Sequence, residues 1–241
     1  MSFFAIVVNK GPLDVLVITD GVLVEFADGR PKRRPGNYMK LIRIPNSDPS
    51  IIVTTGFREF HTAISEAVRQ GNHRFETITD TLSAMEKIII AELSAYPQDS
   101  WGAEWFKANH VVLQYSHSGD VLHIGSIKVN FIPGRIEVRR PAIPESLSPG
   151  VIWWPEGCIP QQNDDVCCII QTPLGCPKLL PEFRSILENN RSFPFRERIP
   201  LLLRDTKVLL NKAMEQCIRV NDGIFYAIAS DGFQIKKYRE Q

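Results

Sequence analysis

The sequence predicts an α+β protein, a four-layer αββα sandwich in which two antiparallel sheets pack face to face and helices cover both outer faces. Three observations support this fold class. The first third of the chain consists of short apolar, β-branched runs that are typical of strands. Two helical patterns then follow as a pair, and strands resume after them. Paired helices do not fit a simple βαβ repeat, in which a helix follows each strand.

The N-terminal third is expected to form strands. They are Phe3–Val8, Val15–Thr19, Val22–Phe26, Met39–Ile44 and Ile51–Thr55. Asn9-Lys10-Gly11-Pro12 has the composition of a turn and joins the first two strands, whereas Ala27–Asn37 is polar and is expected to be a loop. Because these runs are so apolar, we expect the strands to be covered on at least one face.

The helical period begins after the last of these strands. The stripe Phe60, Ala63, Ile64, Ala67 and Val68 predicts a helix that Gly71 ends. A second stripe runs from Phe75 to Leu93 and ends near Pro97. The strands expected to follow are His110–Tyr115, Val121–Ile124, Ile127–Phe131 and Arg135–Val138, with Ser-Gly and Pro-Gly turns between them.

The chain between Pro133 and Pro200 holds eleven of the seventeen prolines, which disfavours long helices there. The elements expected from here on are strands Val151–Trp154 and Val166–Gln171, a short helix Pro181–Asn189, an amphipathic helix Ile199–Cys217, and a closing hairpin Ile224–Ala229 and Phe233–Tyr238 around Asp231-Gly232. We therefore expect one domain, residues 1–241, with a Pro-rich irregular insertion around 133–200.

Composition excludes several classes of protein. The formal net charge of +1 is unlike the basic balance of a nucleic-acid-binding protein. The apolar run Phe3–Val8 is too short for a signal peptide and lacks a basic flank and a cleavage site. No stretch reaches the length of a membrane span. Five cysteines are sparse and odd in number, which favours a reducing, cytoplasmic setting.

Five segments, in this order, resemble the N-terminal nucleophile hydrolases, and specifically the proteasome β-subunits. They are SFFAIVV at the N-terminus, DVLVITDG, MKLIRI, IIVTTGFREFHTAISEAVRQ and the tail VNDGIFYAIASDGFQIKKY. The resemblance covers residues 2–70 best and is absent from the Pro-rich middle. It implies the same αββα sandwich, hydrolysis of amide or peptide bonds, and self-association into a homo-oligomer that could be a ring.

The resemblance also implies a catalytic set: Ser2, Asp20, Lys40 and Gly56. Removal of Met1 would give Ser2 a free α-amine, which can act as the base for its own hydroxyl. Lys40 would lower the pKa of that amine, and Asp20 would hold Lys40 charged and in place. The backbone N–H of Gly56 would stabilise the developing oxyanion. Ser116–Gly119 and Ser126 are candidates for the serine segment that completes such sites.

Each of these residues also has a plain structural interpretation. Ser2 can be an exposed second residue, Asp20 a turn residue that caps its own backbone, Lys40 a solvated residue at a sheet edge, and Gly56 a link from strand to helix. The alternative function is therefore a non-catalytic proteasome-like structural or interaction subunit. Retention of Met1 would favour that alternative.

The remaining polar groups predict neither a metal nor a cofactor. Cys158, Cys167, Cys168 and Cys176 lie close together but form no Cys-x-x-Cys pair, so buried thiols or a small interaction flap are favoured. His110, His117 and His123 lack an acidic partner, which favours structural histidines. The basic segment Gly29–Gly36 is expected to be a solvated loop tip. Trp153 and Trp154 fit either a core plug or a subunit contact.

Overall fold

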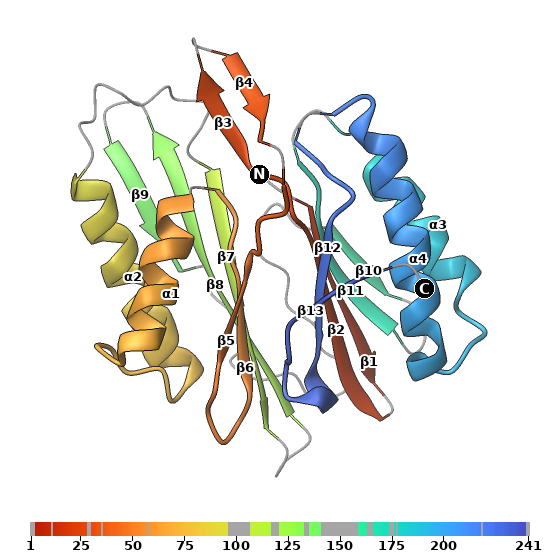
Figure 1. The fold of residues 1–241 in the computed structure, drawn as a ribbon. Helices are drawn as coiled ribbons and strands as arrows, with labels where there is room; N and C mark the ends of the chain where they lie inside the picture. The colour runs from red at the N-terminus through yellow and green to blue at the C-terminus, as the bar shows by residue number, and fades with distance from the viewer. Residues whose placement is uncertain are drawn as a thin grey trace. The chain divides into compact units, whose positions relative to one another are not determined.

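The protein is represented by a computed structural model, which describes residues 3–10, 12–27, 30–34, 36–56, 58–95, 107–116, 121–132, 135–140, 159–162, 166–173, 176, 178–217 and 219–239. The chain divides into two compact units, residues 1–40 with 157–241 and residues 41–156. The first unit contains a six-stranded antiparallel sheet, a two-stranded ribbon and two of the four described α-helices, and the second contains a five-stranded antiparallel sheet and the other two (Figure 1). The predicted α+β class with two antiparallel sheets is confirmed, and the four-layer packing stays a prediction.

The sheet of the first unit has the strand order β10-β11-β1-β2-β12-β13. Its strands are β1 Phe4–Lys10, β2 Leu13–Asp20, β10 Ile159–Gln162, β11 Val166–Gln171, β12 Ile224–Ile228 and β13 Lys236–Lys237. The central strand β2 is buried at all eight positions, as expected for a strand covered on both faces. Its last residue, Asp20, pairs with Ile224 of β12.

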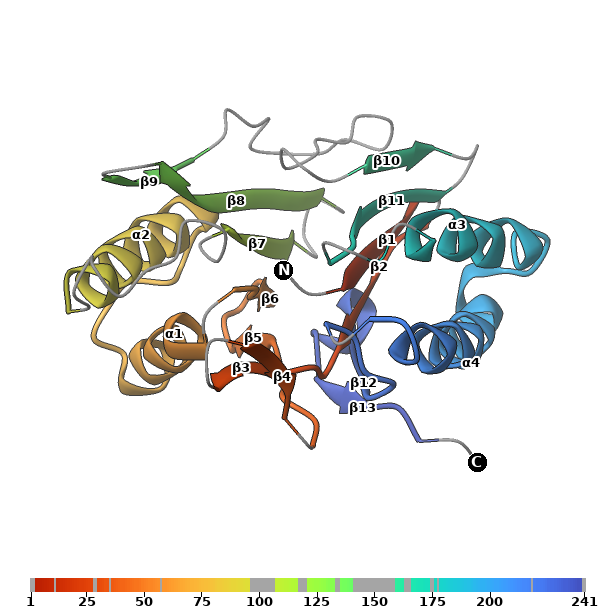
Figure 2. The ribbon, with the colours of Figure 1, turned by 90° about the horizontal axis from the view of Figure 1, so that it is seen from above.

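Helices α3 (Leu179–Asn189) and α4 (Phe195–Met214) lie along one face of this sheet (Figure 2). Phe3, the residue before β1, meets Phe183 of α3 edge to face, with ring centroids 5.4 Å apart. Leu16 and Ile18 of β2 share a core with Leu202 and other apolar residues of α4. The apolar side chains of β2 that face α4 and the apolar stripe of α4 therefore bury each other, as the sequence pattern predicts.

A two-stranded ribbon, β3 (Val24–Ala27) and β4 (Arg30–Arg33), also belongs to the first unit. The prediction of a loop over Ala27–Asn37 is wrong for residues 30–33. The polar sequence gives no strand pattern because β4, among the described strands, pairs with β3 alone, and a ribbon edge tolerates proline at position 31. The basic segment Gly29–Gly36 is thus partly a strand, and not only a loop tip.

The second unit is a sheet with the order β5-β6-β7-β8-β9 and the helices α1 (Arg58–Gln70) and α2 (Ile78–Ala95). Its strands are β5 Leu41–Ile44, β6 Ser50–Val53, β7 Lys107–Ser116, β8 Val121–Ile132 and β9 Arg135–Arg139. Apolar residues of both helices and of the sheet form its core, among them Ile64, Met85 and Val112. Helix α1 is followed by Gly71 in the left-handed conformation (φ 66°), the predicted terminator.

The predicted strands Val121–Ile124 and Ile127–Phe131 are one continuous strand, β8, which pairs with β7 along its whole length. The two residues between the predicted segments, Gly125 and Ser126, form no turn and continue this strand. Gly125 instead allows helix α2 to approach the strand, because a Cβ at this position would lie 2.7 Å from Cδ1 of Leu82. The glycine therefore serves packing between helix and sheet.

The Pro-rich stretch contains regular elements. Strand β11 has the predicted bounds, Val166–Gln171, and helix α3 begins two residues before the predicted Pro181. Strand β10 was not predicted, and the predicted strand Val151–Trp154 lies outside the described residues. At the C-terminus, Gly232 takes the left-handed conformation expected of the turn, although β13 is only two residues long.

Candidate functional site

Asp20 and Lys40 form a buried ion pair in the first unit. The Lys40 ammonium donates a hydrogen bond of 2.5 Å to Oδ1 of Asp20. The side chains are 0% and 6% exposed for Asp20 and Lys40. Asp20 ends strand β2, and Lys40 is the residue before strand β5. The structure thus brings together two of the four residues that the sequence analysis placed in a catalytic set.

Burial shifts the pKa values of both partners. It raises the pKa of the Asp20 carboxyl, while the Lys40 ammonium and the backbone N–H of Asn221 oppose this rise. It also lowers the pKa of Lys40, against the attraction of the Asp20 carboxylate. A lysine whose pKa is lowered exchanges protons closer to neutral pH, which suits a group that takes part in proton transfer.

The start of strand β1 lies beside this pair. The backbone N–H of Asp20 donates to the carbonyl oxygen of Phe3 at 3.3 Å, next to the register pair Phe4 and Thr19. Phe3 is fully buried and is the residue that follows Ser2 in the sequence. Ser2 itself lies outside the described residues.

Burial removes the plain interpretations of Asp20 and Lys40. Lys40 is not a solvated residue of a sheet edge, because almost none of its side chain reaches water. Asp20 does not cap its own turn, since its side chain receives the Lys40 hydrogen bond and the next backbone N–H, of Gly21, donates to Asn221. Two buried charges that pair in this way are costly to desolvate, which favours a specific role for them.

Gly56 belongs to the second unit, between strand β6 and helix α1. Its φ of 87° lies in the left-handed region, which glycine adopts without strain. The neighbouring Thr55 fixes this connection, because its hydroxyl donates to the carbonyl oxygen of Asn109 at 2.7 Å and accepts from the Asn109 N–H at 2.9 Å. Thr54 shares a 2.8 Å hydrogen bond with Nδ1 of His61. Thr54 and Thr55, the two residues before Gly56, are therefore anchored to helix α1 and strand β7.

The serine candidates fall in the second unit as well. Ser126 is buried on β8, and Ser116 ends β7. Residues 117–120, which include Gly119 and His117, lie outside the described residues. The other two histidines differ in burial: His110 on β7 is fully buried, and His123 on β8 is half-buried.

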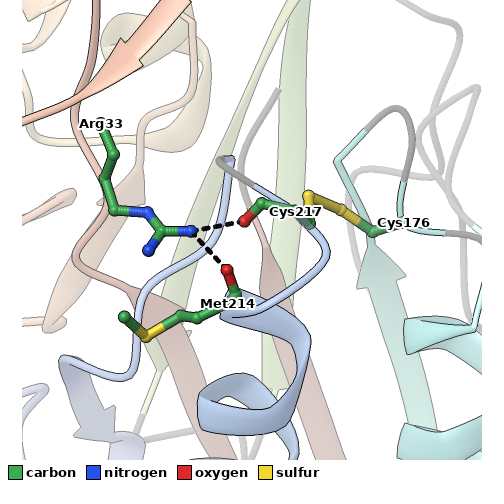
Figure 3. Close-up of a disulfide and its surroundings, with 4 residues drawn as sticks. All are labelled: Arg33, Cys176, Met214 and Cys217. Carbon is green, nitrogen blue, oxygen red and sulfur yellow. Dashed lines mark hydrogen bonds between the residues drawn. A yellow bond between two sulfur atoms is a disulfide. The ribbon is translucent and has the colours of Figure 1, made fainter.

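A disulfide joins Cys176, which precedes helix α3, to Cys217, which follows helix α4. Figure 3 shows Arg33 of β4 beside it. The Arg33 guanidinium donates to the carbonyl oxygens of Met214 and Cys217 at 3.0 and 2.6 Å, so it caps the C-terminal end of α4. This pair was not predicted, because cysteines 41 residues apart share no local pattern in the sequence. Disulfides persist in oxidising compartments, so this pair does not support the reducing setting that the cysteine count favours. A cytoplasmic location stays a prediction.

The described part of the chain offers no group of three or more metal-ligating side chains. Within the same residues, no helix combines the length and the apolar character needed to cross a membrane. The side chains of Cys167 and Cys168 on β11, like Cys158, lie outside the description. The expectation of a buried thiol is wrong for Cys176, which forms the disulfide with Cys217, and the expectation of buried thiols or a flap stays a prediction for the other three cysteines.

No family model matches the sequence, and no curated protein matches it. Solved structures do. The Anbu (ancestral beta-subunit) protein from Yersinia bercovieri superposes with a TM-score of 0.56 at 8% identity, over 99% of this chain and 87% of that one. Anbu from Hyphomicrobium sp. strain MC1 gives 0.50 at 10% identity over 99% and 86%, and its Gly-1 mutant 0.51 at 11% over 99% and 87%. The chain therefore shares its fold with the Anbu ancestral beta-subunits.

Proposed function

We propose that the protein is an N-terminal nucleophile hydrolase of the proteasome β-subunit kind, which cleaves amide or peptide bonds with Ser2 after Met1 is removed. The observation that carries the proposal is the buried Asp20–Lys40 ion pair, which lies where Phe3 meets the end of β2. The fold shared with Anbu, an ancestral beta-subunit, supports it.

In the proposed reaction the Ser2 hydroxyl attacks the substrate carbonyl carbon while the Ser2 α-amine takes its proton. The N–H of Gly56 donates to the carbonyl oxygen as it becomes negative. The same amine then returns the proton to the leaving nitrogen, the C–N bond breaks, and an ester on Ser2 remains for water to hydrolyse. Lys40 lowers the pKa of the α-amine and relays protons, and Asp20 holds Lys40 in place.

The α-amine of an unperturbed chain titrates near pH 7.7–8.0, and a neighbouring Lys40 ammonium would lower that value. Activity is therefore expected to rise with pH and to level off below about pH 8. Assembly into a homo-oligomer, with a peptide or amide as substrate, is part of the same proposal. Light scattering at micromolar protein would contradict the assembly if it showed a monomer.

The experiment compares hydrolysis of a pool of fluorogenic peptides by four proteins. They are the trimmed wild type, a form that retains Met1, Ser2→Ala, and the double variant Asp20→Asn with Lys40→Met. The double variant removes both charges together, because removing Lys40 alone would leave a buried carboxylate unpaired, at a cost of about 3–5 kcal/mol. Only the trimmed wild type should cleave, and the melting temperature should confirm that all four proteins fold.

Lys212→Ala is the matched control, since Lys212 is 71% exposed on helix α4 of the same unit and its removal should leave activity unchanged. Equal activity with and without Met1 would refute the terminal nucleophile. If intact mass shows that native protein keeps Met1, or if trimmed wild type cleaves nothing, the non-catalytic subunit is the better assignment. One observation favours that alternative: Val22, which is buried, stands where the resembled family has an arginine two residues after the aspartate.

A further inference from the structure

The side chain of Asn221 ties three segments of the first unit together. Its Oδ1 accepts hydrogen bonds from the backbone N–H of Gly21 at 2.9 Å and of Gly223 at 3.3 Å. Its Nδ2 donates to the carbonyl oxygen of Gly36 and to Oδ1 of Asn37, both at 3.2 Å. The Asn221 residue is 5% exposed. One buried amide thus uses both its donor and its acceptor, and its partners other than Gly223 lie 184 to 200 residues away in the sequence.

The same junction is closely packed. A Cβ on Gly223 would lie 1.7 Å from Oδ1 of Asn37, and a Cβ on Gly21 would lie 3.2 Å from Asn37. The Asn37 side chain therefore occupies space that only glycine at position 223 leaves free. The N–H of Tyr38 also donates to the carbonyl oxygen of Gly21 at 2.8 Å. These contacts fix residues 36–38 against the end of strand β2.

The ion pair lies immediately next to these contacts. Gly21 follows Asp20, and Asn37 stands three residues before Lys40. Asn221 thus holds the chain on the carboxylate side through Gly21 and on the ammonium side through residues 36 and 37. Loss of its amide would leave the Tyr38–Gly21 hydrogen bond in place but would loosen the junction and admit water to the pair.

From this arrangement we propose that Asn221 is the positioning residue of the Asp20–Lys40 pair, an inference that rests on the proposed hydrolase function for its catalytic meaning. Asn221 acts through Gly21, Gly36 and Asn37 and not on substrate. It keeps the carboxylate and the ammonium at hydrogen-bond distance and away from water.

Other contacts hold the segment that carries Asn221. The Asp222 carboxylate accepts from Lys207 of α4 at 2.6 Å, and the Asp222 N–H contacts the Met214 sulfur at 3.1 Å. The disulfide fixes Cys217 four residues earlier. Because these anchors remain in an Asn221→Ala variant, we expect the segment to stay folded and the change to fall on the ion pair.

The experiment follows the Lys40 side chain directly by NMR of protein labelled with ¹³C at the lysine Cε positions, assigned with the double variant Asp20→Asn, Lys40→Met. In Asn221→Ala the pKa of Lys40 should move up toward that of an ordinary lysine as water enters, because burial is the main cause of its lowered pKa. Peptide hydrolysis should fall about 10- to 100-fold in kcat with little change in KM, because misplaced groups affect the reaction more than binding.

Asn190→Ala is the matched control. Asn190 is equally buried, at 5% exposure, and its Nδ2 donates to Ile186 and Asp205 in the same unit. The Asn190→Ala substitution should lower the melting temperature about as much as Asn221→Ala does, and it should leave the Lys40 resonance and kcat unchanged. Gly223→Ala, which displaces Asn37, should reproduce the Asn221→Ala shift and decides the matter if Asn221→Ala does not fold.

A Lys40 titration in Asn221→Ala or Gly223→Ala that coincides with the wild-type curve would overturn the proposal. So would an equal shift in Asn190→Ala. If the wild type cleaves no peptide, the hydrolase function fails, and the NMR titration still decides whether Asn221 positions the pair.

Discussion

Mild acid should destabilise the protein through His110, a fully buried histidine at the centre of strand β7. Among the described residues, neither of its ring nitrogens has a hydrogen-bond partner. Burial, with a smaller contribution from His61, lowers the pKa of His110 from 6.5 to about 3. Its ring also meets Phe60 of α1 edge to face, with centroids 5.8 Å apart.

The direction of the effect follows from the lowered pKa. In the unfolded chain His110 takes up a proton as the pH falls below 6.5, whereas in the folded chain it stays neutral until about pH 3. The stability it contributes is therefore complete above pH 6.5 and is lost as the pH falls toward 3. The loss amounts to about 2 kcal/mol at pH 5 and approaches roughly 5 kcal/mol below pH 3.

The assay is urea unfolding of the wild type and of His110→Leu at pH 7.5, 6 and 5. Leucine keeps most of the volume and has no proton to bind, so the free energy of unfolding of the variant should fall by about 2 kcal/mol less between pH 7.5 and 5. His123→Leu controls for the loss of an imidazole from the same sheet. If the free energy of unfolding falls equally for the wild type and for His110→Leu over this range, the inference that His110 is buried and neutral is wrong.

Three further changes test the packing. Leu209→Ala on α4 should cost about 2–5 kcal/mol in urea unfolding, because Leu209 is buried in the core of the first unit; a change below about 0.5 kcal/mol, the size expected for the exposed Val208, would contradict this. Reduction of Cys176–Cys217, which closes 41 residues, should cost about 4 kcal/mol, and thiol titration of the denatured protein should rise by two on reduction. Gly125→Ala should cost about 1–3 kcal/mol, since its Cβ would lie 2.7 Å from the side chain of α2; an unchanged melting temperature would show that α2 does not approach β8 so closely.

The sequence predicts those elements in which local pattern and burial agree. Strand β11 and helix α1 show this, because an apolar run or a helical stripe in each case ends at a clear boundary. Strand β4 shows the opposite: Arg30–Arg33 has no apolar pattern, and it becomes a strand by pairing with β3. The disulfide was missed for a related reason, since its cysteines come together only through the packing of α3 and α4.

The residues of the candidate site differ in the same way in how far the sequence predicts them. Asp20 and Lys40 were predicted from short segments whose order resembles a known family, and their pairing was then found in the structure. Asn221 lies in the tail segment that carries part of the resemblance, but Val220-Asn221-Asp222-Gly223 has only the composition of a turn before a strand, so no role was predicted for it.

Its role arises where β12 pairs with β2 and sets Ile224 against Asp20. That register brings residue 221 to the end of β2, at Gly21. A residue that holds a charged pair from 180 or more positions away is specified by sheet register, which periodicity and motifs do not encode. Searches for sites in sequences of this kind should therefore include the polar residues that flank strands neighbouring a predicted ion pair.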